Sequence, residues 1–327
     1  MGGGLWRVGG LYGGRMADEG KRVAVIDIGT NSTRLLIADV VGGRVSPVER
    51  RSTVTRLGRG VDLSGHLSGE AIEDVCAAIG DYVAVIEELG AETVDAIATS
   101  AVRDADNGSA FVAELRERFA LSARVLGGEE EARATYLGAT SEAPPTEPTL
   151  VVDIGGGSTE LVVGQGSEIS FHDSLQAGVV RHSERCISSD PPTAGELEAL
   201  AADVRGLIES SVGPGVSASR GIAVAGTPTS LAAVELELEP YDPARVHGHV
   251  LALPSIQRML SRLASVPLDE RVEISGLHPD RAPTIVAGVV ILVEVMRAFG
   301  LEQIEVSEHD ILYGTAISAS RKNPSIY

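Results

Sequence analysis

The sequence predicts an α/β protein built from two homologous domains that face each other across a ligand-binding cleft. The chain of 327 residues is long enough for two domains. Apolar runs typical of strands alternate along it with apolar residues at helical spacing. A strand–turn–strand pattern also occurs twice, with Asp27 and Asp153 at equivalent places 126 residues apart. Such a repeat is typical of a duplicated domain, each copy offering one turn to a shared ligand.

The composition and net charge of the chain disfavour some classes of binding partner. Hydrophobic residues make up 43% of the chain and charged residues 22%, as in ordinary globular proteins. The net charge of −19 argues against nucleic acid or an anionic membrane as a partner, so a polyanionic substrate needs a local basic pocket and a metal ion. Cys76 and Cys186 lie far apart, and no secretory segment is evident. A cytoplasmic location is therefore expected.

The first repeat follows a glycine-rich stretch, residues 1–20, which we expect to be a disordered leader, with Met16 as an alternative start. A strand over residues 22–26 leads to Asp27, and an apolar run over residues 35–40 forms the second strand. The turn between them is rich in small residues, so its backbone N–H groups can approach a phosphate group. The phosphate-binding candidates in this turn are Gly29, Thr30, Asn31 and Ser32.

The second repeat, residues 150–163, has the same order of an apolar strand, an acidic residue, a glycine turn and a second apolar strand. Asp153 ends its first strand and is a candidate ligand for a divalent cation bound to the same phosphate. The alternative interpretation is a structural hairpin with a flexible tip. The phosphate-binding candidates in this turn are Gly155, Gly156, Gly157 and Ser158.

The segment between the repeats predicts a long helix between Ser68 and Gly90, with Cys76 on its buried face, and a strand over residues 94–98. A polar loop, residues 99–108, follows this strand and precedes a helix over residues 109–119. Loops at this end of a strand commonly bind ligands in α/β proteins. Arg103 in the loop is either a phosphate clamp or the partner of a surface ion pair with a neighbouring aspartate.

Glu131 lies in a predicted helix that begins near Gly127, after a short strand over residues 123–126. Glu129 and Glu130 are explained by the helix dipole, which favours acidic residues in the first turn. Glu131 instead lies beside the apolar face of the helix, where a carboxylate can act as a general base.

The second half of the chain continues the α/β pattern after a Pro-rich linker over residues 141–148. Gly226 and Thr227 open a helix after the strand over residues 221–225 and are further phosphate-binding candidates. His278 is expected to cap a loop rather than bind metal. The other predicted elements are strands over residues 168–175 and 304–306 and helices over residues 179–187, 193–211, 284–299 and 311–319.

With these motifs in place, the chain resembles the exopolyphosphatase/guanosine pentaphosphate phosphohydrolase (Ppx/GppA) family of the actin, sugar-kinase and heat-shock ATPase superfamily. The motifs that carry the resemblance are residues 25–32, 98–103, 128–133, 152–160, 225–227 and 276–281.

The resemblance implies two ribonuclease-H-like (actin-like ATPase) domains with an active site in the cleft between them. We expect domain I to span residues 21–140 together with a C-terminal helix over residues 311–327, and domain II to span residues 141–310. The resemblance further implies a hydrolase that uses Mg²⁺ or Mn²⁺ and in which Glu131 is the catalytic base. Asp153 and Glu160 are the expected metal ligands, Asp27 is a weaker one, and Arg103 is expected to offset developing charge.

The expected reaction is hydrolysis of the terminal phosphoanhydride of inorganic polyphosphate. Longer family members carry an extra C-terminal helical region, and the family's usual final motif is altered at residues 307–314. Short polyphosphate is therefore the expected substrate, and guanosine penta- or tetraphosphate is the alternative ligand. A kinase and a non-catalytic sensor of these ligands stay open as other functions. We expect a homodimer, no nucleic acid partner and no membrane partner.

Overall fold

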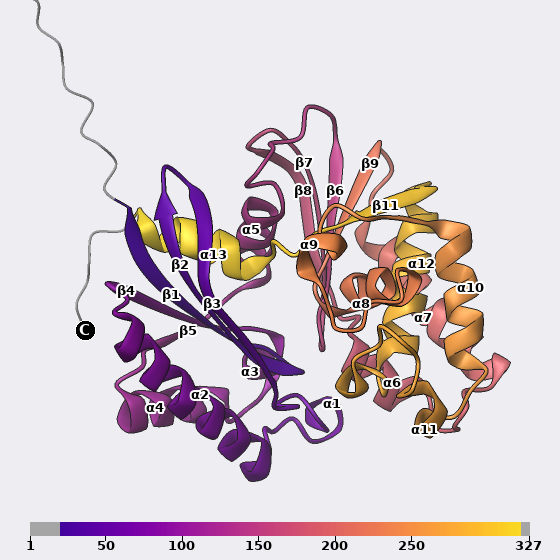
Figure 1. Cartoon of the computed structure of the whole chain (residues 1–327). Coiled ribbons are helices and arrows are strands. Elements are labelled where there is room, and N and C mark those ends of the chain that lie inside the picture. The colour runs from indigo at the N-terminus through magenta and orange to yellow at the C-terminus, as the bar shows by residue number, and fades with distance from the viewer. Residues whose placement is uncertain (1–19, 322–327) are drawn as a thin grey trace, which may run out of the picture.

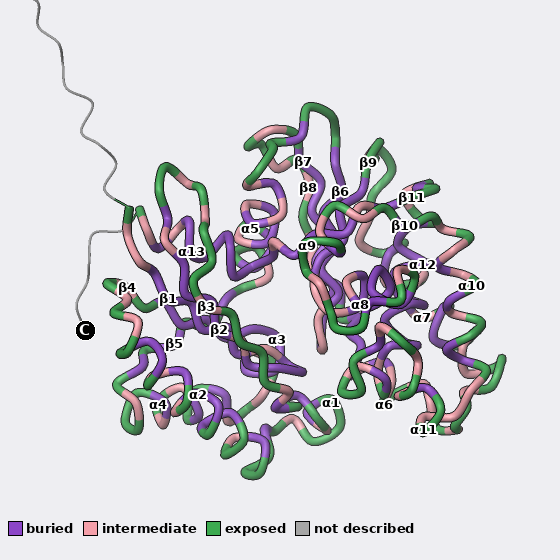
Figure 2. The backbone as a smooth tube through the Cα atoms, in the orientation of Figure 1, coloured by how far each residue is buried: buried purple, intermediate pink, exposed green. Residues whose placement is uncertain are grey.

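The structure is a computed structural model that describes residues 20–321. The expected leader, apart from Gly20, and the end of the expected C-terminal helix lie outside this range. Two lobes, each built around a mixed β-sheet, lie side by side (Figure 1). Figure 2 shows that the central strands of both sheets are buried, whereas much of β3 is exposed.

The first sheet has the strand order β3-β2-β1-β4-β5. β1 pairs antiparallel with β2, and parallel with β4, which in turn lies parallel to β5. The strands are β1 (Lys21–Ile28), β2 (Ser32–Val41), β3 (Arg44–Val54), β4 (Thr93–Ala98) and β5 (Ala123–Val125).

The second sheet has the order β10-β11-β9-β6-β7-β8, which repeats the first sheet and adds one edge strand. β6 pairs antiparallel with β7 and parallel with β9, as β1 does with β2 and β4. The predicted duplication is therefore confirmed in strand order and direction. The strands are β6 (Thr149–Ile154), β7 (Thr159–Gln165), β8 (Glu168–Leu175), β9 (Arg220–Val224), β10 (Val250–Ala252) and β11 (Gln303–Val306).

Helices cover the sheets where the apolar spacing predicted them. In the first lobe α2 begins after Ser68, whose side chain accepts a hydrogen bond from the backbone N–H of Ala71, and it ends at Gly90 in the left-handed conformation. The expected loop 99–108 instead contains a short helix, because residues 100–104 form one helical turn. The helices are α1 (Val61–Ser64), α2 (Gly69–Leu89), α3 (Ser100–Asp104), α4 (Gly108–Phe119) and α5 (Gly128–Ala139).

The second lobe has its largest apolar core around α12, which is buried along most of its length. The capping box of Thr193 and Glu196 is present at the start of α7, as predicted. The elements are α6 (Val179–Cys186), α7 (Ala194–Ser211), α8 (Gly226–Glu235), α9 (Pro243–Val246), α10 (Leu253–Ala264), α11 (Leu268–Arg271), a 3₁₀ turn (Pro279–Arg281) and α12 (Ile285–Ala298). The last helix, α13 (Ile311–Ser320), follows this lobe in the chain but packs on the first lobe.

Helices α5 and α13 cross between the lobes and pack on each other (Figure 1). α13 returns to the first sheet, where its apolar residues pack on β1 and β2, whereas Tyr136 of α5 packs on β6 and β7 of the second sheet. Their backbones meet at Gly138 and Gly314, where an added Cβ would lie 1.9 Å and 1.8 Å from carbonyl oxygens of the other helix. Only glycine permits this approach. The domain boundaries at residues 140 and 310 stay a prediction.

Candidate active site

The two glycine turns meet directly at the junction of the lobes. A Cβ added at Gly156 would lie 2.7 Å from the Cβ of Thr30 and 3.0 Å from the backbone nitrogen of Asn31. The hydroxyl of Thr30 also forms a hydrogen bond of 2.8 Å with that of Ser100 at the start of α3. The paired turns expected from the repeat therefore lie face to face in one site.

The two hairpins differ in the residue opposite their aspartate. Strand register places Arg34 opposite Asp27 in the first hairpin and Glu160 opposite Asp153 in the second. The guanidinium of Arg34 donates to the Asp27 carboxylate at 2.9 Å and also pairs with Asp310. Directly opposed side chains lie on the same face of a sheet, so Asp153 and Glu160 form a close pair of carboxylates.

Asp153 and Glu160 have no ion pair within residues 20–321, and both are buried. Hydroxyls of Ser158 and Ser174 donate to Glu160 at 2.7 and 2.9 Å, and that of Thr135 to Asp153 at 3.4 Å. Burial, followed by neighbouring negative charges such as that of Asp310, raises the pKa of Asp153 to about 7. Burial together with Glu131 and Asp153 raises the pKa of Glu160 well above its ordinary value. A divalent cation is the group that such a pair of oxygen donors fits.

Glu131 lies in the first turn of α5 and points inward as predicted, with 6% of its surface exposed. Arg103 of α3 donates to its Oε2 at 2.8 Å and to the carbonyl of Leu126 at 2.9 Å. Burial raises the pKa of Glu131 to about 7, although the charge of Arg103 opposes the shift. Arg103 also lies 3.8 Å from Asp104, as the ion-pair interpretation expected, and its role as a phosphate clamp stays a prediction. Its strongest contact orients Glu131.

A cavity of about 70 Å³ lies between the turns, and four carboxylates line it, those of Asp27, Glu131, Asp153 and Glu160. Two polar atoms at this cavity, Oδ1 of Asp27 and Nδ2 of Asn31, are buried without a hydrogen-bond partner in the described chain. Buried polar atoms of this kind are normally satisfied by a ligand or water. The donor, Nδ2 of Asn31, fits a phosphate oxygen, and the acceptor, Oδ1 of Asp27, fits the counter-ion of the phosphate.

Only some of the predicted phosphate-binding residues line this cavity. Gly29, Asn31, Ser32, Gly155 and Gly226 line it. The other candidates have different contacts: Thr30 and Gly157 meet Ser100, Gly156 meets Thr30, Ser158 donates to Glu160, and Thr227 faces Gly288 of α12.

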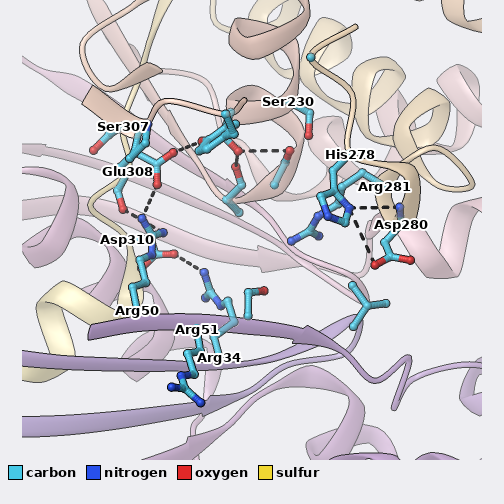
Figure 3. Close-up of a pocket in the computed structure, with 18 residues that line it drawn as sticks. Arg34, Arg50, Arg51, Ser230, His278, Asp280, Arg281, Ser307, Glu308 and Asp310 are labelled. Carbon is cyan, nitrogen blue, oxygen red and sulfur yellow. Dashed lines mark hydrogen bonds and ion pairs between the residues drawn. The ribbon is translucent and has the colours of Figure 1, made fainter. Parts of the chain in front are cut away.

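A larger pocket of about 470 Å³ adjoins this cavity and shares Arg34, Ala225, Gly226 and Arg281 with it. Figure 3 shows arginines from both lobes around this pocket, with Arg50 held by Glu308. Arg281 makes no ion pair within the described range, and it lies over Gly226, where an added Cβ would be 2.7 Å from its Nη1. Burial lowers its pKa. A partly buried guanidinium that makes no ion pair is suited to bind an anion.

Arg34 and Arg281 were not among the predicted site residues. Arg34 lies in the first repeat, seven residues after Asp27, and Arg281 lies in the motif over residues 276–281. Strand pairing opposite Asp27 was a usable signal for Arg34. His278 caps the 3₁₀ turn through its Nδ1, as expected.

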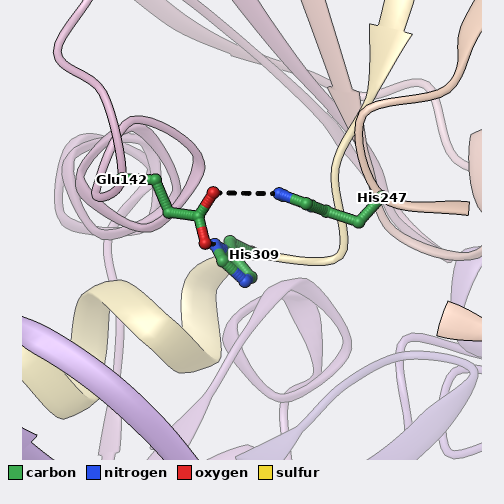
Figure 4. Close-up of side chains that lie close together, drawn as sticks. All are labelled: Glu142, His247 and His309. Atoms are coloured by element: carbon green, nitrogen blue, oxygen red, sulfur yellow. Dashed lines mark hydrogen bonds and ion pairs between the residues drawn. The ribbon is translucent and has the colours of Figure 1, made fainter. Parts of the chain in front are cut away.

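A second cluster, formed by Glu142, His247 and His309, lies outside this site (Figure 4). Nε2 of His247 lies 3.3 Å from Glu142, and the rings of His247 and His309 stack with centroids 4.3 Å apart. The backbone N–H of Glu308 donates to Nδ1 of His247 at 3.2 Å, so the proton of the neutral ring lies on Nε2. This tautomer donates to Glu142 and cannot also offer Nε2 to a metal.

Comparison with known proteins identifies relatives that match most of the chain. The model of the Ppx/GppA phosphatase family matches residues 36–319. The chain is 37% identical to exopolyphosphatase 2 of Mycobacterium tuberculosis, over 91% of this chain and 98% of that protein. The crystal structure of the Aquifex aeolicus Ppx/GppA family member superposes with a TM-score of 0.79 at 33% identity, covering 91% of this chain and 97% of that one.

A more distant relative is the guanosine-5'-triphosphate,3'-diphosphate pyrophosphatase of Photobacterium profundum, which is 29% identical. That match covers 85% of this chain and 55% of the relative.

The repeated sheets and the acidic cavity between them define a phosphatase of the two-domain, actin-like ATPase fold. The chain belongs to the Ppx/GppA phosphatase family, as its resemblance implied. No helix in the described range is long and apolar enough to cross a membrane.

Proposed function

We propose that this protein is an exopolyphosphatase that releases orthophosphate from the end of short inorganic polyphosphate chains. The observation that carries the proposal is that the two cavities adjoin. The carboxylate-lined cavity of about 70 Å³ has room for one reacting group, and it shares Arg34 and Arg281 with the larger pocket, which arginines line together with Asp280, Glu308 and Asp310. A terminal phosphate in the first cavity would place the following phosphates among the arginines, whose forked donors match phosphate oxygens.

Glu131 is the proposed general base. Its pKa of about 7 lies near neutral pH, where a carboxylate can accept a proton from water most effectively. Arg103 holds Oε2 of this carboxylate, so Oε1 is available to the water. Nδ2 of Asn31, which lacks a partner, would donate to the terminal phosphate together with N–H groups of the turns.

Asp153 and Glu160 would hold the divalent cation, Mg²⁺ or Mn²⁺. When bound, it would neutralise phosphate oxygens and stabilise the charge that develops during hydrolysis. Asp27 stays the weaker candidate ligand, because Arg34 already compensates its charge. Arg281 would provide a positive charge that no carboxylate within the described residues neutralises by an ion pair.

Guanosine pentaphosphate is the second candidate substrate. The pocket of about 470 Å³ lies within the size range of small-molecule sites and can hold a nucleoside as well as phosphates. The name of the Photobacterium relative points to this substrate. The arginines that surround the pocket favour polyphosphate, because a guanine base would bring no negative charge to them.

The test compares phosphate release from short polyphosphate, long polyphosphate, guanosine pentaphosphate and ATP, each with Mg²⁺ and with Mn²⁺. We expect the highest kcat/KM with short polyphosphate. A preference for guanosine pentaphosphate would favour the second candidate, and tight binding without turnover would favour a sensor.

The variant Glu131→Gln tests the base. We expect kcat to fall by about 10²–10⁴-fold, because the amide cannot accept the proton. Glu129→Gln is the matched control, since Glu129 lies on the same helix but is exposed and pairs with Arg133. Near-normal phosphate release by Glu131→Gln would refute the assignment.

A further inference from the structure

Arg181 on α6 connects the two lobes beside the active site. Its Nε donates to the carbonyl of Gly157 at 2.8 Å, within the second glycine turn. Its Nη1 pairs with Asp62 of α1, and its Nη2 with Asp104 of α3 at 2.7 Å. The side chain is 13% exposed, so solvent screens these contacts weakly. One planar guanidinium thus joins the second turn to two elements of the first lobe.

The backbone around Arg181 is fixed to the same turn. The N–H groups of Val179 and Val180, in the first turn of α6, donate to the carbonyls of Gly155 and Gly156 at 2.9 and 2.8 Å. These N–H groups have no partner inside their own helix, so the turn provides their acceptors. Any displacement of Arg181 therefore moves the turn that lies next to Asp153 and Glu160.

Asp104, which pairs with Arg181, is also connected by contacts to the proposed base, Glu131. Asp104 lies 3.8 Å from Arg103, which donates to Glu131 at 2.8 Å. Arg103 and Asp104 are consecutive residues of the one-turn helix α3, so the position of one constrains that of the other. A continuous set of contacts therefore runs from Gly157 through Arg181 and Asp104 to the residue that orients Glu131.

We propose that Arg181 is a positioning residue for phosphate hydrolysis, which fixes the second glycine turn relative to the Arg103–Glu131 pair. This inference rests on the proposed function, because it assigns Glu131 the role of base. Misplacement of a reacting group by about 1 Å can cost on the order of 10²-fold in rate. Arg181 touches none of the reacting groups and acts through the residues that it holds.

Arg185, one helical turn further along α6, provides a matched comparison. It also pairs with Asp62, at 2.8 Å, and it lies 3.7 Å from Asp203. Its side chain is 44% exposed. Arg185 contributes to contact between the lobes but reaches neither the turn nor Asp104 through any contact in the described structure. If Arg181 only held the lobes together, substitution of Arg181 and substitution of Arg185 would affect kcat in the same way.

The experiment measures kcat and KM for phosphate release from short polyphosphate in Arg181→Gln, Arg185→Gln and Asp104→Asn, after thermal melting has confirmed that each variant is folded. We expect Arg181→Gln to lower kcat by about 10- to 100-fold while KM changes by less than about threefold. Asp104→Asn should reproduce the loss of kcat, because it removes the same ion pair between Arg181 and Asp104 by changing the carboxylate. Arg185→Gln should stay within about twofold of the unmodified protein.

A second measurement does not depend on activity. Hydrogen exchange without substrate should be faster in peptides covering residues 99–104 and 155–160 of Arg181→Gln, and unchanged in Arg185→Gln. Equal kcat values and equal exchange in the two arginine variants would overturn the proposal. If the unmodified protein releases no phosphate from any substrate, the proposed function fails, whereas the exchange result still decides whether Arg181 fixes the turn.

Discussion

The adjacent carboxylates of Asp153 and Glu160 lower the stability of the metal-free protein in a pH-dependent way. The pKa of Glu160 is raised well above its ordinary value and that of Asp153 is raised to about 7. The folded protein therefore binds more protons than the unfolded chain at pH values between the ordinary carboxyl pKa, about 4, and these raised values. The free energy of unfolding therefore falls as pH rises through this range. We expect the metal-free protein to melt at a lower temperature at pH 8 than at pH 5.5 on account of this pair.

Replacing Glu160 with glutamine should raise the melting temperature of the metal-free protein at pH 8 by about 2–4 °C, equivalent to roughly 1 kcal/mol. The substitution removes one of two facing charges, and the amide oxygen can still accept from Ser158 and Ser174. It should also abolish the rise in melting temperature that Mg²⁺ or Mn²⁺ gives the unmodified protein, since one ligand is lost. Thermal unfolding at pH 5.5 and pH 8, with and without the ion, measures both effects.

Glu209→Gln is the control for this prediction, because Glu209 is an exposed carboxylate of α7 that does not line the cavity. It should leave both the metal-free melting temperature and the metal-induced shift unchanged. A Glu160→Gln protein that keeps the full metal-induced shift would show that the ion binds elsewhere.

At the scale of elements, the crossing of α5 and α13 depends on glycine. A Cβ at Gly314 would lie 1.8 Å from the carbonyl oxygen of Ala134, and backbone cannot move aside as a flexible side chain can. Gly314→Ala should therefore reduce the free energy of unfolding by at least about 1–3 kcal/mol. Urea denaturation measures the loss.

Gly206 of α7 is the matched control, since it is also a helical glycine but has no heavy atom within 4 Å of an added Cβ. Gly206→Ala should raise the free energy of unfolding by about 0.5–1 kcal/mol, because alanine favours a helix more than glycine does. If both alanine variants change stability in the same direction, the close crossing of α5 and α13 is not a tight constraint in solution.

Elements with a strong apolar pattern could be predicted from the sequence, and those without one could not. The two hairpins and α2 have apolar residues at the spacing of strands and helices, and they occur as expected. β3 was missed because it is an exposed edge strand with a run of charged residues and Pro47, so little of it is buried. The short elements α9 and β10 of the second lobe give too few residues for a pattern.

In the candidate site, too, residues that form a local sequence pattern could be predicted, whereas contacts between residues far apart in the sequence could not. The turn residues and Asp153 belong to one local pattern, which was enough to select them, whereas Glu160 was selected through the family resemblance. The contact of Arg103 with Glu131 joins two helices, and Arg281 reaches the cavity from a loop of the other lobe. Such contacts depend on how the lobes pack, which local pattern does not specify. Thr227 opens a helix as expected, yet packing turns it toward Gly288.

At the scale of the whole molecule, two electrostatic effects oppose each other if the substrate is polyphosphate. The net charge of −19 repels a polyanion at long range, whereas Arg281 of the larger pocket, which has no ion pair among the described residues, attracts it at short range. The Debye length is about 30 Å at 0.01 M salt and about 10 Å at 0.1 M. Salt therefore screens the long-range repulsion first, and the contacts inside the partly closed pocket only at higher concentration.

We accordingly expect kcat/KM for short polyphosphate to rise as ionic strength increases from about 0.01 to 0.1 M, and to fall above roughly 0.3 M. The measurement keeps the free Mg²⁺ concentration constant, so that salt does not act through the metal. Arg281→Gln should keep the rise but have a lower kcat/KM throughout, because it removes a short-range attraction and leaves the net charge nearly unchanged. A steady fall of kcat/KM from the lowest salt onward would mean that the local positive field already outweighs the repulsion at long range. In that case the overall charge of the molecule would not limit the approach of its substrate.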